Sequence, residues 1–219
     1  MALSDKRILE EIKKGNLVIE PFNRKNLATS SYDVRLGEWY FREQRQNFDV
    51  YNPYDKNQTD KVWGTKPQKA DLAKNVLKDF AFQGIKPTDK IILISPGETI
   101  LAHTEEFLGG KNEITTMMKA RSSMGRNFIE VCKCAGWGDV GYTNRWTMEI
   151  TNNSRFYTIP LVVGRRIAQI VFFEVGPLLT ADYTKVGKYQ KTTDLNKMKK
   201  EWTPLSMLPK LYNDWEIKK

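Results

Sequence analysis

The side chains best suited to chemistry lie between residues 117 and 152, in the segment MMKARSSMGRNFIEVCKCAGWGDVGYTNRWTMEITN. Arg121 and Arg126 flank two serines, a combination of cations and hydroxyl donors that suits phosphate oxygens, although an ordinary polar turn can have the same composition. Glu149 lies in RWTMEITN, where alternation predicts a strand with Thr147 and Glu149 on one face. The apolar residues of this strand share the other face: Trp146, Met148 and Ile150. A solvated sheet face shows the same alternation, so the pattern alone leaves the role of Glu149 open.

Carboxylates are the catalytic candidates that the composition leaves. The chain has one histidine, His103, so it lacks the His and Cys clusters of zinc deaminases and zinc hydrolases. His103 lies in ILAHTEEF and no nucleophile elbow is present, which argues against a Ser-His-Asp triad and favours a structural histidine. A Walker-type phosphate loop is also missing from the sequence. We therefore expect no zinc.

The two cysteines, Cys132 and Cys134, form a C-x-C pattern. In a strand their side chains would point to the same face, which is poor geometry for a disulfide within the chain. We predict two free thiols.

Composition limits the class of protein. The 219 residues are 40% hydrophobic and 28% charged, which is typical of a soluble globular protein. No apolar run approaches the roughly 20 residues of a membrane span, and the N-terminal MALSDKRILEEI is charged where a signal peptide is apolar, so we predict a cytoplasmic protein. The net charge of +9 favours an anionic partner: nucleic acid, a membrane surface or a phosphorylated small molecule. Residues 184–200 hold six Lys against one Asp and are predicted to be a mobile basic segment or a solvated face.

Short strands are expected to position these residues. Ser4 and Gly15 bound an amphipathic helix, and LVIEPF and SSYDVRLGEWYF then alternate with the period of strands. Strand patterns return from residue 90 to residue 175, punctuated by Gly, Pro and Asn, which predicts an all-β fold, a barrel or a sandwich of jelly-roll type. Residues 45–90 are predicted to be an insertion with a helix over 69–80. Residues 191–219 are predicted to be a tail whose Trp202 and Trp215 pack on the barrel or on a neighbouring subunit.

The chain resembles the dCTP deaminase family, relatives of the trimeric dUTPases. The segments that carry the resemblance follow the order of the family from residue 3 to about residue 190: LSDKRILEEIKKGNLVIEPF, SSYDVRLG, SPGETILAHTEEF, KARSSMGR, AGWGDVGY with TMEITN, GRRIAQIVFFE and GKYQ. The resemblance implies a distorted β-barrel of the dUTPase type over residues 1–190, with a short N-terminal helix and peripheral helices. It also implies a homotrimer with active sites at the subunit interfaces.

The resemblance assigns roles residue by residue. Glu149 matches the glutamate that activates a water for attack on cytosine C4 and moves the proton toward the leaving ammonia. Ser122 and Arg126 match residues that hold this water, and Asp139 matches the residue near the deoxyribose that positions the hydrolytic water in dUTPases. The positions that match substrate-binding residues are Arg121 and Ser123 in the triphosphate cradle, Ala135 and Gly136 in the backbone around the base, Gln169 at a phosphate, Lys188 in the closing tail, and also Trp137 and Tyr183.

The resemblance implies a dCTP deaminase that releases dUTP and ammonia, with Mg²⁺ bound through the triphosphate and without zinc. Its ligands would be dCTP and related nucleotides such as dUTP and dTTP, and not nucleic acid or a membrane. A bifunctional, dUMP-forming deaminase is the first alternative, because AGWGD resembles the AG-x-x-D segment of dUTPases. A regulatory relative without turnover is the second, although it would lack the catalytic carboxylate.

Three positions depart from the family pattern. Gly138 stands where the family usually has Ile or Val, and Asn144 stands where it has Gly, a change that still permits a left-handed backbone. After GKYQ the family's Gln and Gly-Pro are replaced by KTTDLNKMKKEW. The resemblance also implies that the C-terminal tail closes over the bound nucleotide, and this replacement affects that implication most.

Overall fold

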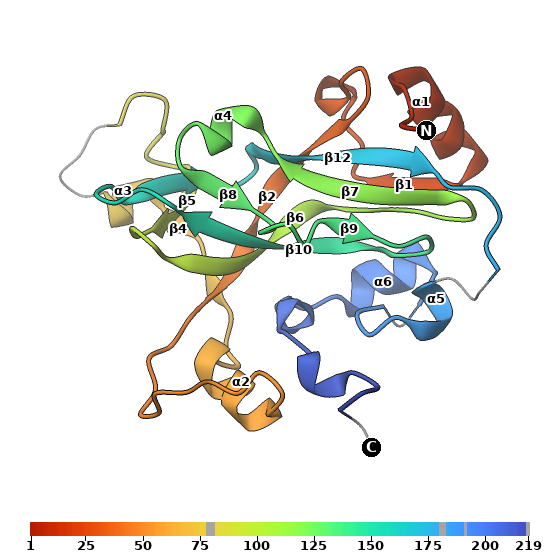
Figure 1. Cartoon of the computed structure of the whole chain (residues 1–219). Coiled ribbons are helices and arrows are strands. Elements are labelled where there is room, and N and C mark those ends of the chain that lie inside the picture. The colour runs from red at the N-terminus through yellow and green to blue at the C-terminus, as the bar shows by residue number, and fades with distance from the viewer. Residues whose placement is uncertain (78–81, 180–182, 191, 218–219) are drawn as a thin grey trace.

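Antiparallel strands are the main regular structure in the computed structural model, which describes residues 1–77, 82–179, 183–190 and 192–217. The strands of the larger sheet are β1 (Leu17–Glu20), β2 (Tyr32–Arg42), β3 (Gln68–Lys69), β6 (Thr99–Gly110), β7 (Ile114–Ala120), β8 (Ile129–Val131), β9 (Trp137–Gly138), β10 (Thr143–Asn152) and β12 (Arg166–Glu174). They follow the order β8-β10-β6-β2-β12-β7-β9, with β1 added to β6 and β3 to β2 (Figure 1). A smaller sheet holds β4 (Asp71–Leu72), β5 (Lys90–Ile94) and β11 (Ile159–Val162). The predicted all-β fold is confirmed.

The core lies against the apolar faces of the long strands. Tyr32, Ile100, Met148 and Phe172 are almost fully buried in one cluster that draws on β2, β6, β10 and β12. Because side chains alternate along β10, burying Met148 and its apolar neighbours turns Thr147 and Glu149 to the opposite face, as the alternation predicted. The register of β10 on β6 shifts between Arg145 and Thr147, and this irregularity bends the strand.

The N-terminal helix α1 (Asp5–Lys14) forms where the capping residues predicted it. The Ser4 hydroxyl accepts a hydrogen bond from the Arg7 backbone N–H at 3.4 Å, and Gly15 ends the helix in the left-handed conformation, with φ 78°.

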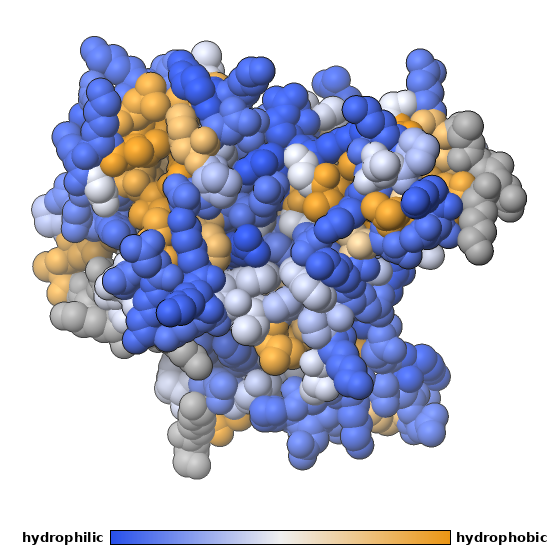
Figure 2. Space-filling model, turned by 180° about the vertical axis from the view of Figure 1, so that it is seen from behind, coloured by the Kyte–Doolittle hydropathy of each residue, from blue (hydrophilic) through white to orange (hydrophobic). Residues whose placement is uncertain are grey.

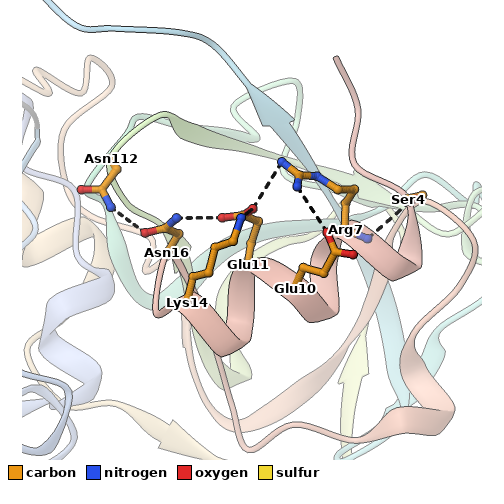
Figure 3. A network of polar contacts seen from close by, with 7 residues as sticks. All are labelled: Ser4, Arg7, Glu10, Glu11, Lys14, Asn16 and Asn112. Carbon is orange, nitrogen blue, oxygen red and sulfur yellow. Dashed lines mark hydrogen bonds and ion pairs between the residues drawn. The ribbon is translucent and has the colours of Figure 1, made fainter.

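A polar network ties α1 to the barrel (Figure 3). The buried Glu11 carboxylate accepts hydrogen bonds from Lys14 Nζ at 2.8 Å and Asn16 Nδ2 at 2.7 Å, and it also pairs with Arg7 at 3.3 Å. The bonds from Lys14 and Asn16 hold the pKa of Glu11 below its usual value. Asn112, in the turn between β6 and β7, donates to Asn16 Oδ1 at 2.6 Å, so the end of the helix is held against that turn.

The insertion over residues 45–90 differs from its predicted structure. The helix expected over 69–80 is replaced by β3, β4 and the short α3 (Ala73–Val76), while residues 78–81 lie outside the described residues. Pairing of β3 with β2 and of β4 with β5 buries Ala70 and Ala73, and this tertiary pairing outweighs the local helical pattern. The helix of the insertion is α2 (Lys56–Trp63), which begins after the capping side chain of Asp55.

The cysteines do not lie in a strand. Cys132, Lys133 and Cys134 have φ values of 69°, 38° and 67°, so the chain forms a left-handed turn where it leaves β8. Cys132 is consequently buried while Cys134 is exposed, and the prediction that both point to one face is wrong. The turn is held to β10 by a hydrogen bond from the Cys132 N–H to the Glu149 carbonyl at 2.9 Å. Both thiols are free, as predicted.

The C-terminal segment packs on the barrel. It contains α5 (Tyr183–Val186), α6 (Leu195–Glu201) and the 3-10 helices η2 (Pro204–Met207) and η3 (Leu211–Asn213), and in Figure 1 it lies on the same side of the sheet as α2. Met198 and Gln190 are buried, so the described part of residues 184–200 packs at these two positions, while Lys197, Lys199 and Lys200 are exposed, as expected for the solvated face. Trp202 packs on His103, as predicted for the tail, whereas Trp215 is 85% exposed.

His103 fills a structural position in β6. It is buried, its Nδ1 lies 2.8 Å from the Thr104 carbonyl, and its Nε2 accepts a hydrogen bond from the Trp39 backbone N–H at 3.3 Å. Burial lowers the pKa of His103 to about 4, so the ring is neutral at pH 7. Gly37 is required beside it, because a Cβ there would lie 2.0 Å from the imidazole Cε1. None of the helices in the described ranges has the length and apolarity to cross a membrane.

Candidate active site

Glu149 borders a cavity of about 350 Å³. The residue lies in β10 directly opposite Leu101 of β6, and both residues line the cavity. Burial raises the pKa of the Glu149 carboxyl above its usual value, an effect that its own backbone N–H and the nearby Lys133 only partly oppose. Among the described residues no other side chain donates a hydrogen bond to this carboxylate or forms an ion pair with it. The group is therefore available to a ligand, and its raised pKa makes it a better proton acceptor than an exposed glutamate.

Four other predicted site residues line the same cavity: Ala135, Trp137, Asp139 and Tyr183. The predicted Gly136 lies between the first two and is buried against β7, where a Cβ would come within 2.3 Å of the Met118 carbonyl oxygen. This close approach requires glycine and fixes the backbone that carries its neighbours. The structure thus brings these six predicted residues, Glu149 included, to one place.

The two departures from the family pattern near the cavity have structural reasons. A Cβ at Gly138 would lie 2.4 Å from the ring of Trp146, so the large indole occupies the space that Ile or Val would need. Asn144 is a strand residue of β10 and is not among the residues with positive φ, so the expected left-handed turn is wrong at this position. Its side chain instead donates to the Tyr189 carbonyl at 3.1 Å and connects β10 to the C-terminal segment.

The C-terminal segment supplies cavity residues that sequence reasoning missed. Tyr189, Ser206, Met207 and Pro209 line the cavity together with the barrel residues. Met207 is held there because it is buried in a second apolar cluster: Phe41, Leu101 and Met207, with Trp39, Trp63 and Leu208 packed against them. Trp63 belongs to α2, so the insertion and the tail jointly cover this side of the site. No local pattern in the tail indicates this contact.

The remaining predicted residues lie elsewhere in the chain. Ser122 and Ser123 lie in α4 (Ser122–Gly125), Arg126 follows it, and all three are exposed. Arg121 pairs with Asp33 at 3.2 Å and lines a different cavity of about 620 Å³.

Two more predicted contacts also lie away from the Glu149 cavity. Gln169, in β12, is registered between Asp33 of β2 and Lys119 of β7. Lys188 pairs with Asp214 of the C-terminal segment. Within one chain the predicted site is therefore divided into a carboxylate part and an arginine and serine part.

Replacing Glu149 with Gln should alter the pH dependence of stability. The pKa of Glu149 is raised above 4.5 in the folded state, so the folded protein binds this proton more tightly than the unfolded chain does. The free energy of unfolding therefore falls as pH rises from the unfolded-state pKa through the folded-state pKa. Glu149→Gln removes that loss. We expect the melting temperature of the variant, relative to that of the wild type, to increase between pH 4 and pH 8. The increase should be about 2–4 °C for each kcal/mol of unfolding free energy that the wild type loses. A difference between the two proteins that stays constant over this pH range would contradict the expectation.

The sequence and the fold have counterparts among known proteins. A family profile described as dCTP deaminase-like matches residues 2–175. The chain is 35% identical over 175 residues to a Hydrogenobaculum protein named "dCTP deaminase, dUMP-forming", covering 78% of this chain and 81% of the relative. A protein of the same name from Nanoarchaeum equitans is 29% identical over 192 residues, covering 87% of this chain and 93% of the relative.

A crystal structure has a similar fold. The 2'-deoxycytidine 5'-triphosphate deaminase from Agrobacterium tumefaciens matches with a TM-score of 0.53 at 18% identity, over 78% of this chain and 46% of that one. At this level of identity the match speaks for the fold alone.

Proposed function

Because the chain belongs to the dCTP deaminase-like family, we propose that it hydrolyses dCTP to dUTP and ammonia. The observation that carries the proposal is the half-buried Glu149, which lines a cavity of about 350 Å³ together with Ala135, Trp137 and Asp139. Pockets of this size are suited to small organic ligands, and the raised pKa of Glu149 suits a group that must both accept and donate a proton.

In the proposed reaction Glu149 takes a proton from a water molecule while the water oxygen forms a bond to cytosine C4. The same carboxyl then donates this proton to the exocyclic nitrogen, and the C4–N bond breaks to release ammonia. The remaining proton on the C4 oxygen moves to ring N3, which gives the C4 carbonyl and the N3–H of uracil. One water is consumed, and the carboxylate is regenerated. Ser122 and Arg126 would hold the water and the base, and burial raises the pKa of Glu149, which favours the protonated form that the second step needs.

We also propose that a second copy of the chain completes the site. Ser122, Ser123 and Arg126 are exposed and do not line the Glu149 cavity, so they would meet the substrate from a neighbouring subunit of a homotrimer. Several large apolar side chains are exposed, among them Trp137 at 56% and Phe128 at 53%, and Figure 2 shows that hydrophobic residues gather in patches on the face opposite that of Figure 1. Such patches are typical of subunit contacts.

Mg²⁺ would enter with the substrate triphosphate. Within the described residues no group of three or more His, Cys, Asp or Glu side chains forms a candidate metal cluster. A single carboxylate such as Asp139 fits a Mg²⁺ ion that is held mainly by phosphate oxygens. When bound, the ion neutralises part of the triphosphate charge. Arg121, Ser123, Gln169 and Lys188 would then contact the phosphates.

Zinc should have no influence on the rate. Catalytic zinc sites use three protein ligands drawn mainly from His, Cys and acidic residues, and this chain has one His and two Cys. We expect the initial rate of ammonia release to change by less than about 20% when zinc or a zinc-selective chelator is added at fixed Mg²⁺. An activity that the chelator removes and zinc restores would contradict the proposed metal-free deamination.

A dUMP-forming activity is the second candidate. The two relatives described above are both named as dUMP-forming, and Asp139 lines the same cavity as Glu149. A carboxylate beside the sugar could activate a second water for attack on the α-phosphorus, which would give dUMP and pyrophosphate.

The direct test is to incubate the protein with dCTP and Mg²⁺ and to separate dUTP, dUMP, pyrophosphate and ammonia. Release of ammonia supports the deaminase, and dUMP with pyrophosphate adds the second activity. Binding of dCTP without ammonia would instead support the regulatory alternative. The cytoplasmic location, and the binding of dUTP and dTTP, stay predictions.

A further inference from the structure

The guanidinium of Arg145 is half-buried and has no hydrogen-bond partner among the described residues. It lies in β10, four residues before Glu149, and lines the same cavity. Its Nε atom is buried and unsatisfied, and among the described residues no group hydrogen-bonds to or pairs with its guanidinium. Buried polar groups in folded proteins nearly always have partners, so an orphaned guanidinium in a cavity calls for a ligand.

Two aromatic rings hold the guanidinium in place. The Cζ atom of Arg145 lies 5.0 Å from the centre of the Phe107 ring in β6 and 4.6 Å from the ring of Trp202 in the C-terminal segment. Aromatic rings interact with the flat faces of a guanidinium, whereas its five N–H donors lie in the plane of the group and need acceptors. The rings therefore leave the hydrogen-bonding requirement of Arg145 unmet.

The carboxylates near Arg145 form ion pairs with other cations. Glu105, Glu106 and Glu38 act to raise the pKa of Arg145, although burial, the largest effect, lowers it. Arg35 pairs with Glu105 at 3.1 Å and with Glu106 at 2.7 Å.

The third acid is similarly engaged, since Glu38 pairs with Lys69 at 3.0 Å and with Lys90 at 2.5 Å. Each carboxylate near Arg145 is thus closer to another cation, and none lies within ion-pair distance of Arg145. Within the part of the chain that the structure describes, no acceptor satisfies the guanidinium, so a ligand is the candidate acceptor.

We propose that Arg145 binds a phosphate of the nucleotide that occupies the Glu149 cavity. The inference rests on the proposed function, since it adds a substrate-binding residue to that site. Guanidinium binds phosphate through paired hydrogen bonds, which suits a group whose in-plane donors are free. Four strand residues span roughly 13 Å, so a nucleotide whose base meets Glu149 can extend its phosphates toward Arg145. Trp202 and Phe107 then act as positioning residues for the arginine.

The experiment compares Arg145→Gln and Arg145→Lys by ligand binding. Both substitutions are made in a Glu149→Gln background, which prevents turnover. Binding of dCTP, of deoxycytidine and of inorganic triphosphate, each with Mg²⁺, is measured by calorimetry and by the shift of the melting temperature. Arg45→Gln is the matched control, because it removes the same charge from a side chain that is 89% exposed in the insertion. We expect Arg145→Gln to weaken binding of dCTP and of triphosphate about 10- to 100-fold and to leave deoxycytidine binding unchanged. The affinity of Arg145→Lys for dCTP and triphosphate should lie between those of the parent and Arg145→Gln, because lysine keeps the charge but lacks the planar guanidinium.

The stability of the ligand-free protein separates this role from a structural one. Removing an unpaired buried cation should leave the melting temperature unchanged or raise it. The proposal is overturned if dCTP binding stays within twofold of the parent, if deoxycytidine and dCTP weaken equally, or if Arg145→Gln dissociates the oligomer without affecting triphosphate. If the variant loses triphosphate binding but the wild type releases no ammonia from dCTP, the phosphate site is supported and the proposed function is refuted.

Discussion

Glu149→Gln is expected to abolish deamination while the protein still folds and binds dCTP. Gln has nearly the same shape as Glu but cannot accept the proton of the attacking water or return it to the leaving ammonia. Acid–base catalysis of this kind contributes roughly 10²–10⁴ in rate. We therefore expect kcat for ammonia release to fall by at least about 1,000-fold and the Kd for dCTP to change by less than about threefold. Ammonia release and equilibrium binding measure the two quantities separately.

A control variant removes the same charge nearby. Glu130 lies in β8, which pairs with β10, but it does not line the Glu149 cavity. Glu130→Gln should therefore keep nearly full activity. Wild-type activity should rise with pH as Glu149 ionises, and the midpoint of the rise should lie above the usual pKa of a glutamate because burial raises the pKa of this residue. Near wild-type ammonia release from Glu149→Gln would remove Glu149 from the mechanism.

Asp139→Asn is expected to change the products. Asp139 is exposed at the Glu149 cavity, in the turn between β9 and β10. If the protein forms dUMP, this carboxylate is the group available to orient and deprotonate the second water. We expect the wild type to yield at least some dUMP and pyrophosphate, and the variant to form dUMP about 100-fold more slowly. Ammonia release should stay within about threefold, so dUTP should accumulate. Chromatography of the nucleotides over time measures both steps.

The outcomes of this experiment separate three roles for Asp139. Asp49→Asn is the control, because that side chain is 98% exposed in the insertion and should leave both products unchanged. If Asp139 only stabilises the β9–β10 turn, the variant should lose both activities together and melt at a lower temperature. A wild-type product that is dUTP alone, after long incubation with ample Mg²⁺, would refute the bifunctional activity and leave the simple deaminase.

Features that depend on neighbours along the chain could be predicted from the amino-acid order. Ser4 and Gly15 bound α1 because a capping hydroxyl and a left-handed glycine act on the adjacent helical turn. The alternation along β10 turned Glu149 away from the core, since strand geometry fixes a period of two. The order of short motifs also identified the family, because it records a common ancestry independently of how the motifs meet in space.

The residues that meet at the site are set by the packing of distant elements. It placed Ala135, Trp137, Asp139 and Tyr183 with Glu149 and kept α4 apart from them, and it brought Met207 from the tail into the same cavity. It also replaced the expected strand at the cysteines with a left-handed turn and enclosed Arg145 between rings of β6 and the tail.

These features depend on contacts between residues that are distant in sequence. Such contacts are set by the packing of whole elements, and a local pattern holds no record of which distant side chain will fill a given space. Arg145 illustrates the limit: a charged residue in a strand pattern predicts a solvated position. Only the packed structure leaves its guanidinium half-buried and without a hydrogen-bond partner in the described ranges.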